Sequence, residues 1–335
     1  MSFAFSGAVS LRGPAMKAVI ASSGEQAWQL QDVPVPEPAE NQVLIRVHAS
    51  GVCYNDLHQS RGTPGHEPAG EIVAVGPGVR SRCVGDRVGV LLWQSACGRC
   101  EWCQRDKPLF CSHIVGTSMH LPGSHAEYML AYADATVLLP EGLTYEQAAP
   151  LFCAGYTAYA GLRAADPRPG ETVAVVGIGG LGHLAVQYAK ASGFRTIAVT
   201  QSTDKETPIS DLGADEIVRD GRALAAVGGA DVVLGTSRSM SAQSDAMQGL
   251  RPEGRMVIMG LGSAPLEVSA GQLIMKRARI VGSQHNGREY LYQVLDFAAR
   301  GKVTAVTESY DLAEAAAVRE RLLEGAVRFR AVLVM

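Results

Sequence analysis

The sequence predicts an α/β protein in which a β-rich part is followed by a doubly wound parallel sheet. Up to about residue 150, short apolar runs such as 43–47, 71–76 and 86–92 are separated by glycine and proline, a pattern typical of short strands and turns. From about residue 155, apolar β runs alternate with helical patterns, which indicates βαβ units and a parallel sheet. The chain has 335 residues and 47% hydrophobic composition, enough for two domains with separate cores.

The same patterns place the individual elements along the chain. The prolines of "VPVPEP" (33–38) favour an extended segment, because proline lacks the N–H that a helix interior needs. The apolar residues of "GLGHLAVQYAKASG" (180–193) recur at helical spacing. Strands are also expected at 172–177, 196–200, 231–235, 255–260 and 330–334, and helices at 288–301 and about 312–324.

Composition and charge exclude several kinds of partner. The net charge is −3 and no basic patch or charged tail occurs, so neither nucleic acid nor an anionic membrane is expected as a partner. No run of about 18 apolar residues occurs, so we expect no membrane span. The N-terminus lacks a basic start followed by a long apolar block, which predicts a cytoplasmic protein without a secretory signal. The first strand-like run begins at Met16, and residues 1–15 are interpreted as an extension.

A glycine-rich turn follows the strand expected at 172–177. Gly177, Gly179 and Gly182 are in G-x-G-x-x-G register, with Gly180 and Leu181 inside the same turn. The first glycine permits a tight turn, the second lets the backbone approach a pyrophosphate, and the third allows close packing of helix on strand. A purely structural βα turn is the alternative. The position between a buried strand and a helix favours dinucleotide binding.

The end of the next strand bears on which dinucleotide binds. NAD sites usually place an acidic residue there for the ribose 2′-hydroxyl, but this strand ends in Thr200. Without a carboxylate a 2′-phosphate meets no repulsion, and Ser202 and Lys205 could supply a donor and a charge. We therefore expect NADP(H). The alternative is that Asp204 binds the ribose and that the cofactor is NAD(H).

Seven cysteines in a chain without a secretory signal favour metal binding or catalysis over disulfides. Four of them, Cys97, Cys100, Cys103 and Cys111, have the spacing Cys-x2-Cys-x2-Cys-x7-Cys. Four thiolates this close match a closed tetrahedral zinc site without a position for substrate, and we interpret the site as structural. An iron–sulfur cluster and four free thiols are the alternatives. Cys83 is left over and is expected to be a buried thiol.

Several motifs occur in one order along the chain. They are "GVCYNDLH" (51–58), "PGHE" (64–67), the four-cysteine segment, "CAGYTAY" (153–159) and "GIGGLGH" (177–183). In this order they resemble the zinc-dependent medium-chain alcohol dehydrogenases over essentially all of 16–335. The chain is most similar to the alcohol and cinnamyl-alcohol dehydrogenase branch. The resemblance implies a GroES-like catalytic domain over 1–154 and 283–335 and a Rossmann dinucleotide-binding domain over 155–282.

The resemblance also implies a second zinc site. Cys53, His66 and Cys153 would hold a catalytic zinc, because a Cys₂His set leaves a fourth position for water or substrate. Glu67 would lie behind it as a transient or alternative ligand. Asp56 would orient the zinc-binding histidine, as metal-bound histidines usually require.

Three further roles follow from the resemblance. His58 would form the outer end of a proton relay, Thr157 would lie near the nicotinamide, and Arg330 would bind the pyrophosphate. A solvated loop histidine is the alternative for His58, and a surface charge is the alternative for Arg330.

The chain departs from the family around this site. Asn55 stands where relatives carry a serine or threonine, and an amide cannot relay a proton as a hydroxyl does. Either water or Tyr54 replaces the relay, or the reaction does not need one. Only seven residues separate His58 from His66, where relatives carry a longer stretch that lines the substrate pocket. A more open pocket is therefore expected.

Other residues are expected to shape this pocket. His125 precedes "AEY" where relatives usually have an aromatic residue, and it is expected either to face the substrate or to lie at the surface. Leu92 and Trp93 are expected to form part of the pocket wall.

The expected reaction is hydride transfer between NADP(H) and an alcohol, aldehyde or ketone, a small-molecule substrate. Reduction of an iminium or a conjugated C=C bond is an alternative, because it would not require protonation of an oxygen. A zinc-free quinone or enoyl reductase is disfavoured because all three catalytic-zinc ligands are present. A non-catalytic structural or sensor protein is an alternative of another class. By analogy with relatives, a homodimer or homotetramer is expected through an edge strand at 279–283.

Overall fold

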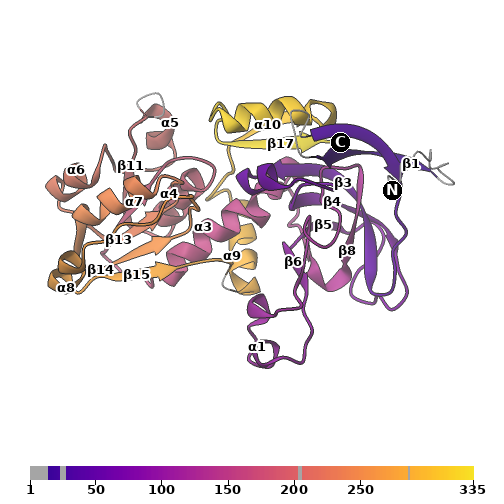
Figure 1. The fold of residues 1–335 in the computed structure, drawn as a ribbon, viewed down its shortest axis with the longest axis horizontal. Helices are drawn as coiled ribbons and strands as arrows, with labels where there is room; N and C mark the ends of the chain where they lie inside the picture. The colour runs from indigo at the N-terminus through magenta and orange to yellow at the C-terminus, as the bar shows by residue number, and fades with distance from the viewer. Residues whose placement is uncertain (1–13, 23–27, 203–205, 286) are drawn as a thin grey trace, which may run out of the picture. The chain divides into compact units, whose positions relative to one another are not determined.

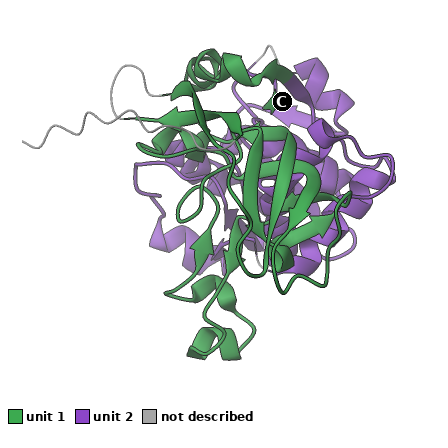
Figure 2. Ribbon diagram, turned by 90° about the vertical axis from the view of Figure 1, so that its right-hand side faces the viewer, with its two compact units in different colours: residues 1–138, 309–326, 332–335 green, residues 139–308, 327–331 purple. Residues whose placement is uncertain are grey.

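The computed structural model describes residues 14–22, 28–202, 206–285 and 287–335. The chain forms two compact units, shown in Figure 2: unit 1 comprises 1–138, 309–326 and 332–335, and unit 2 comprises 139–308 and 327–331. The domain boundaries expected at 154 and 283 stay a prediction. Most of the extension expected at 1–15 lies outside the described residues.

The first large sheet has seven strands in the order β16-β17-β3-β4-β5-β9, with β8 paired to β3 (Figure 1). Its strands are β3 (Gln42–Val52), β4 (Glu67–Val75), β5 (Arg87–Val90), β8 (Tyr128–Tyr132), β9 (Thr136–Leu138), β16 (Thr307–Asp311) and β17 (Arg330–Val334). The ladders of β3 with β4 and β8 are antiparallel, as are those of β5 with β4 and β9. Alternate residues of these strands, such as Val43, Ile45 and Val47, are buried in one apolar cluster.

Smaller elements complete unit 1. They are β1 (Ala15–Ala21), β2 (Trp28–Pro34), β6 (Trp93–Ser95), β7 (Val115–Gly116), α1 (Glu101–Gln104) and α10 (Ala315–Leu323). Strands β1 and β2 form an antiparallel pair, and so do β6 and β7. Helix α1 lies on a loop that extends away from the strands of unit 1 (Figure 1).

Unit 2 contains a six-stranded parallel sheet in the order β12-β11-β10-β13-β14-β15. Its strands are β10 (Thr172–Val176), β11 (Arg195–Val199), β12 (Glu216–Val218), β13 (Ala230–Gly235), β14 (Leu250–Ile258) and β15 (Arg279–Gly282). The strand order reverses between β10 and β13, and open α/β sheets bind ligands at such a switch point, beyond the carboxyl ends of the strands.

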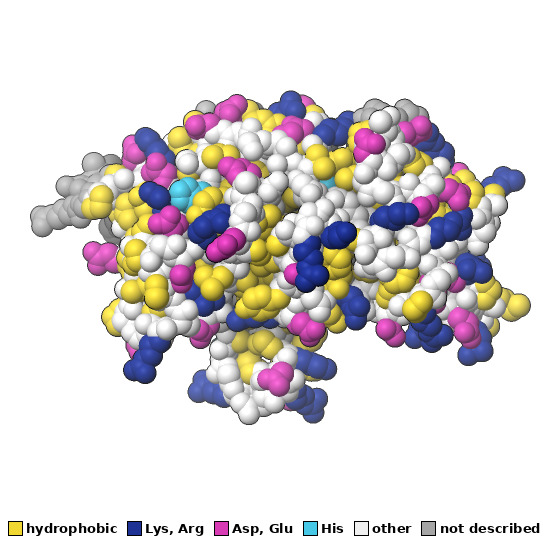
Figure 3. Space-filling model, turned by 180° about the vertical axis from the view of Figure 1, so that it is seen from behind, with side chains coloured by type: hydrophobic (Ala, Val, Ile, Leu, Met, Phe, Trp, Pro, Cys, Tyr) yellow, Lys and Arg dark blue, Asp and Glu magenta, His cyan; other side chains and the backbone are white. Residues whose placement is uncertain are grey.

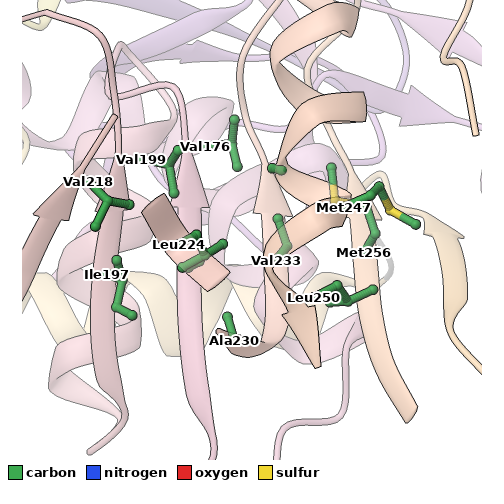
Figure 4. Packing of buried hydrophobic residues seen from close by; sticks show 12 residues of the cluster. Val176, Ile197, Val199, Val218, Leu224, Ala230, Val233, Met247, Leu250 and Met256 are labelled. Atoms are coloured by element: carbon green, nitrogen blue, oxygen red, sulfur yellow. The ribbon is translucent and has the colours of Figure 1, made fainter. Parts of the chain in front are cut away.

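The helices of unit 2 pack on this sheet and on one another. They are α2 (Tyr145–Ala148), α3 (Ala154–Ala164), α4 (Gly182–Ala191), α5 (Glu206–Asp211), α6 (Gly221–Ala226), α7 (Met240–Ala246), α8 (Ala270–Lys276) and α9 (Arg288–Ala299). Helix α3 contacts α4 and α9, and α6 contacts α7. Figure 4 shows side chains of the sheet, among them Ile197, Val233 and Met256, in one buried apolar cluster with Leu224 of α6.

The structure confirms the predicted fold class and the predicted strands and helices, with ends shifted by a few residues. The runs at 43–47, 71–76 and 86–92 lie in β3, β4 and β5, and 279–283 overlaps the edge strand β15. Within the described ranges, no helix is long and apolar enough to cross a membrane. Figure 3 shows basic and acidic side chains interspersed over one face of the molecule.

Candidate active site

The β3–β4 ladder brings together residues that lie far apart in the sequence. Strand β3 ends directly before Cys53, and β4 begins with Glu67, directly after His66. Gly51 lies opposite Glu67 in the antiparallel register. A Cβ on Gly51 would lie 2.2 Å from the Glu67 carboxylate, so this position needs glycine to leave room for the buried acid. The ladder therefore places a thiol, an imidazole and a carboxylate at one end of two strands.

Four buried side chains form a group that could hold a metal ion. They are Cys53, His66, Glu67 and Cys153, and their ligand atoms all lie within 4.8 Å of one another. Cys153 directly precedes helix α3. Sulfur and imidazole nitrogen are preferred zinc ligands, and a buried carboxylate adds an oxygen ligand. The chemistry of this donor set fits zinc.

Asp56 determines which nitrogen of His66 can bind a metal. The Nδ1–H of His66 donates to Asp56 Oδ1 at 2.7 Å, and the backbone N–H of Cys53 donates to Asp56 Oδ2 at 2.8 Å. Because Nδ1 is engaged, Nε2 is left for a metal. Burial alone would raise the pKa of Asp56, but the charge and hydrogen bond of His66 hold it below its usual value. Burial lowers the pKa of His66, and Asp56 overcomes this effect and raises it well above its usual value.

The four cysteines of the loop around α1 form the second group. The ligand sulfurs of Cys97, Cys100, Cys103 and Cys111 lie within 4.8 Å of one another. Backbone N–H groups point at the sulfurs: that of Cys100 donates to Cys97 Sγ at 3.4 Å, and that of Cys97 to Cys111 Sγ at 3.5 Å. N–H groups aimed at sulfur stabilise thiolates, so the loop fits a structural zinc ion.

Cys83 is exposed, and the expectation of a buried thiol is wrong. It lies in the turn between β4 and β5, next to Val84, which is 61% exposed, and Gly85, whose φ is +92°. The N–H of Asp86 donates to the carbonyl oxygen of Cys83 at 3.2 Å, and this turn before β5 leaves the thiol exposed to solvent.

The glycine-rich turn after β10 has the geometry of a phosphate-binding loop. Gly177 has φ +87°, and a Cβ there would lie 2.6 Å from Ser237 Cβ. A Cβ on Gly182 would lie 2.1 Å from the carbonyl oxygen of Gly177, so the close approach of α4 to β10 requires glycine. At Gly179 a Cβ would meet no atom within 4 Å. The protein itself gives no steric reason for glycine there, which fits close approach of a ligand to the backbone.

Other predicted cofactor residues lie around this turn. A Cβ on Gly180 would lie 2.8 Å from Arg330 Nη1, so the guanidinium of this 5% exposed side chain lies over the turn. The surface alternative for Arg330 is therefore excluded. Leu181 immediately precedes α4, and Thr157 lies in the second turn of α3, half-buried.

A cationic residue that sequence reasoning missed lies next to the end of β11. Thr200 is buried, and its hydroxyl accepts the N–H of Ser202 at 3.3 Å. Arg219 follows β12 and donates to the carbonyl oxygens of Thr200 and Ser202 at 3.3 and 3.4 Å, while forming an ion pair with Glu206. Lys205 and Asp204 lie outside the described residues. The signal in the sequence was that Arg219 directly follows β12, the strand next to β11, at the carboxyl ends of both strands.

The residues expected in the proton path and pocket occupy different environments. Asn55 and His58 lie in one 3-10 helix (Tyr54–His58), and both are exposed. The rings of Tyr54 and His58 meet edge to face at 5.4 Å. Leu92 is half-buried, immediately before β6, and Trp93 begins that strand, also half-buried.

His125 has no exposed surface, which excludes a surface histidine. Its Nδ1 lies 2.8 Å from Ser50 Oγ. Sequence reasoning missed Ser50 altogether, because this serine follows the run predicted at 43–47 and carries no signal of its own, although it lies within the observed β3.

Comparison with known proteins finds two family models along the chain. Residues 39–141 match the alcohol dehydrogenase GroES-like domain, and residues 180–300 match the zinc-binding dehydrogenase family. An alcohol dehydrogenase of Geobacillus stearothermophilus is 37% identical over 334 residues, covering 95% of this chain and 99% of that protein. The aldehyde reductase YahK of Escherichia coli is 34% identical over 340 residues, covering 95% and 97%. The structure of a cinnamyl-alcohol dehydrogenase of Helicobacter pylori complexed with NADP(H) has a TM-score of 0.85 and 26% identity, covering 96% and 98%.

Proposed function

This chain belongs to the zinc-dependent medium-chain alcohol dehydrogenases, and on that premise we propose that it interconverts alcohols and aldehydes with NADP(H). It is a zinc-dependent alcohol dehydrogenase or aldehyde reductase that uses NAD(P) and acts on a small molecule. The observation that carries the proposal is the buried group of Cys53, His66, Glu67 and Cys153, with Asp56 hydrogen-bonded to its histidine.

We assign the roles of the site residues from this geometry. Cys53, His66 and Cys153 would hold the zinc through two sulfurs and Nε2, with Glu67 as the alternative ligand. Zinc in this set would polarise the substrate oxygen, and the nicotinamide would give or take the hydride. Asp56 fixes the tautomer of its histidine through the 2.7 Å hydrogen bond. The buried positions of all four ligands keep competing water away from the donor atoms.

The cofactor would be held in unit 2. Gly179 would accept close approach of the pyrophosphate, and Arg330 lies over the same turn with a positive charge. Gly180 and Leu181 would offer backbone at the start of α4, and Thr157 would contact the nicotinamide.

The preference for NADP(H) is supported by the end of β11. Thr200 carries no charge to repel a 2′-phosphate, and Ser202 offers a hydroxyl. Arg219 brings a guanidinium to the same loop, where Glu206 pairs with it. A phosphate that displaced Glu206 would find a bidentate donor of the right geometry.

We expect kcat/KM to be at least about tenfold higher with NADPH than with NADH, because a hydrogen bond to a charged group contributes about 1.5–3 kcal/mol. Arg219→Gln should lower kcat/KM for NADPH by about tenfold and leave the NADH value within about twofold. Steady-state kinetics with both cofactors measure this. A wild-type preference for NADH would refute the assignment, and an equal loss with both cofactors would place Arg219 against the adenine instead.

A second candidate function is favoured by Asn55. This exposed amide precedes Asp56 in the 3-10 helix and cannot pass a proton. A substrate that needs no proton on oxygen, such as an iminium or a conjugated C=C bond, would suit the site. Otherwise Tyr54, whose ring meets His58, or a water molecule would carry the proton.

Asn55→Ser should raise kcat for alcohol oxidation by about tenfold or more, because positioned acid–base groups contribute about 10²–10⁴-fold. Asn55→Ala, which adds no hydroxyl, is the matched control and should leave kcat within about twofold. Initial rates with a panel of alcohols, aldehydes and cyclic imines measure the effect. If Asn55→Ser leaves alcohol oxidation unchanged or slower, the missing hydroxyl does not limit the reaction.

We also propose a homodimer or homotetramer that uses the edge of the parallel sheet. Strand β15 ends the sheet, and Ile280 on it is 38% exposed. Ile274 and Met275 of α8 are 72% and 83% exposed. An edge strand flanked by exposed apolar side chains is suited to pairing with a second copy.

A further inference from the structure

His125 lies in a segment whose backbone is hydrogen-bonded to the turn that carries His66. The N–H of Gly123 donates to the carbonyl of Thr63 at 2.8 Å, that of Ser124 to Gly65 at 3.0 Å, and that of His125 to Pro64 at 2.9 Å. Residues 123–125 therefore run alongside 63–65. A Cβ on Gly65 would lie 2.5 Å from His125 Nδ1, so the imidazole is packed directly against the turn.

The ring itself is part of a buried polar network. His125 Nδ1 lies 2.8 Å from Ser50 Oγ, which lies 2.7 Å from Ser124 Oγ. His125 Nε2 lies 3.7 Å from Asp56 Oδ2. The ring of Trp28 packs against the His125 ring edge to face, with the two ring centroids 5.2 Å apart. All of the polar groups in this network are buried.

The tautomer of His125 follows from its neighbours. Asp56 acts as an acceptor through both oxygens, from the Nδ1–H of His66 and from the backbone N–H of Cys53, as a carboxylate does. An unprotonated Nε2 would direct its lone pair at this carboxylate, which is unfavourable in a buried site. We therefore place the proton on Nε2, and Nδ1 accepts the hydroxyl hydrogen of Ser50. Burial lowers the pKa of His125 to about 4, so the ring is neutral at physiological pH.

The buried position of the His125 imidazole requires a physical explanation. Burying an imidazole costs free energy that an aromatic hydrocarbon would not cost, although either ring could pack on the face of Trp28. On the side of the metal group, His125 has an N–H that faces Asp56. Phenylalanine has no such group. The same carboxylate accepts the Nδ1–H of His66 through its other oxygen.

We propose that His125 is a positioning residue that, through Asp56, orients His66 and increases the zinc affinity of the Cys53–His66–Cys153 site. The inference rests on the assignment of that site to zinc. His125 lies behind Asp56 and acts on the metal through two side chains. This role differs from the contact with substrate that its place in the sequence suggested.

Two substitutions distinguish the roles of the two ring nitrogens of His125. His125→Gln keeps an amide N–H near the position of Nε2, whereas His125→Asn keeps a polar group only near Nδ1. We expect the asparagine variant to bind zinc at this site about tenfold more weakly than wild type, and the glutamine variant to stay within about threefold. His125→Phe should behave like the asparagine variant, because it also lacks the N–H.

The zinc affinity is measured by chelator competition on protein that keeps its four-cysteine zinc. The visible spectrum of cobalt placed in the site reports ligand geometry without turnover. A shift of the cobalt bands in the asparagine and phenylalanine variants, absent in the glutamine variant, is the expected result. Midpoints of unfolding identify any variant that has lost its fold. Zinc affinities and cobalt spectra are then compared among the variants that remain folded.

Three outcomes would overturn the inference. Unchanged zinc affinity and cobalt spectra in the asparagine and phenylalanine variants would show that the N–H does not act on the site. An equal loss in all three variants would show that only the shape of the ring matters. Wild-type protein with a single zinc per chain would refute the zinc assignment itself, and this result is visible before any variant is made.

Discussion

His66→Asn should lower kcat/KM for alcohol oxidation by roughly 10⁴-fold and reduce the zinc content from two ions to one per chain. Zinc binds thiolate sulfur, imidazole nitrogen and carboxylate oxygen, and the neutral amide of asparagine is none of these. Loss of zinc removes several kcal/mol of stabilisation of developing charge, and about 1.4 kcal/mol corresponds to a factor of ten in rate. Steady-state kinetics and metal analysis on the same preparation measure both effects.

His113→Asn is the matched control for this variant. His113 is exposed and its side chain contacts Ser112 on the four-cysteine loop, away from the buried metal group. It should keep both zinc ions and activity within about twofold. A His66→Asn protein that retains both ions and most of its activity would show that His66 is not a ligand, and would contradict the proposed function.

Cys103→Ser should have the largest effect on stability. Removal of one thiolate opens the four-sulfur site of the loop around α1, and structural zinc contributes its binding free energy to folding. We expect the free energy of unfolding to fall by on the order of 3–5 kcal/mol and one zinc ion to be lost. Denaturant titration followed by tryptophan fluorescence measures the first effect, because Trp102 lies on this loop.

Cys83→Ser is the control for the loss of a thiol. Cys83 is exposed and lies outside both metal groups. This variant should match wild type in stability and zinc content. The catalytic zinc should remain in Cys103→Ser, so its activity at low temperature should decline far less than that of His66→Asn. A Cys103→Ser protein with wild-type stability would contradict the structural role of the loop.

The four-cysteine site and the glycine-rich turn could be predicted because their residues are close in sequence. Three cysteines separated by two residues each can come together around α1 independently of how the rest of the chain folds. Gly177, Gly179 and Gly182 lie in one βα turn, so their geometry depends on local backbone conformation. For such sites the spacing itself carries the information.

The catalytic group could not be derived in that way. Cys53 and His66 meet because the β3–β4 register places Gly51 opposite Glu67, and a shift of one residue would point the side chains of β4 to the other face. Cys153 joins them from the start of α3. Only the resemblance to a known family suggested this set, because no spacing rule connects its members.

The environments of single residues depended even more on tertiary structure. Thr200 was visible from the sequence as the end of a strand, but the Arg219 guanidinium next to it comes from the residue after another strand, β12. Cys83, left over from the metal groups, was expected to be buried, yet a turn exposes it. His125 carried no signal for burial, since histidine occurs in both environments.

The amino-acid sequence by itself therefore determined the order of the elements, the glycine-rich turn and the four-cysteine site, all of which depend on residues close along the chain. Only the tertiary structure decided that Asp56 lies between His66 and His125, at 2.7 and 3.7 Å. The physical reason is that hydrogen bonding between strands and packing of the turn set these distances. Both depend on contacts between separate segments of the chain, as between Gly51 and Glu67 or between Ser50 and Ser124.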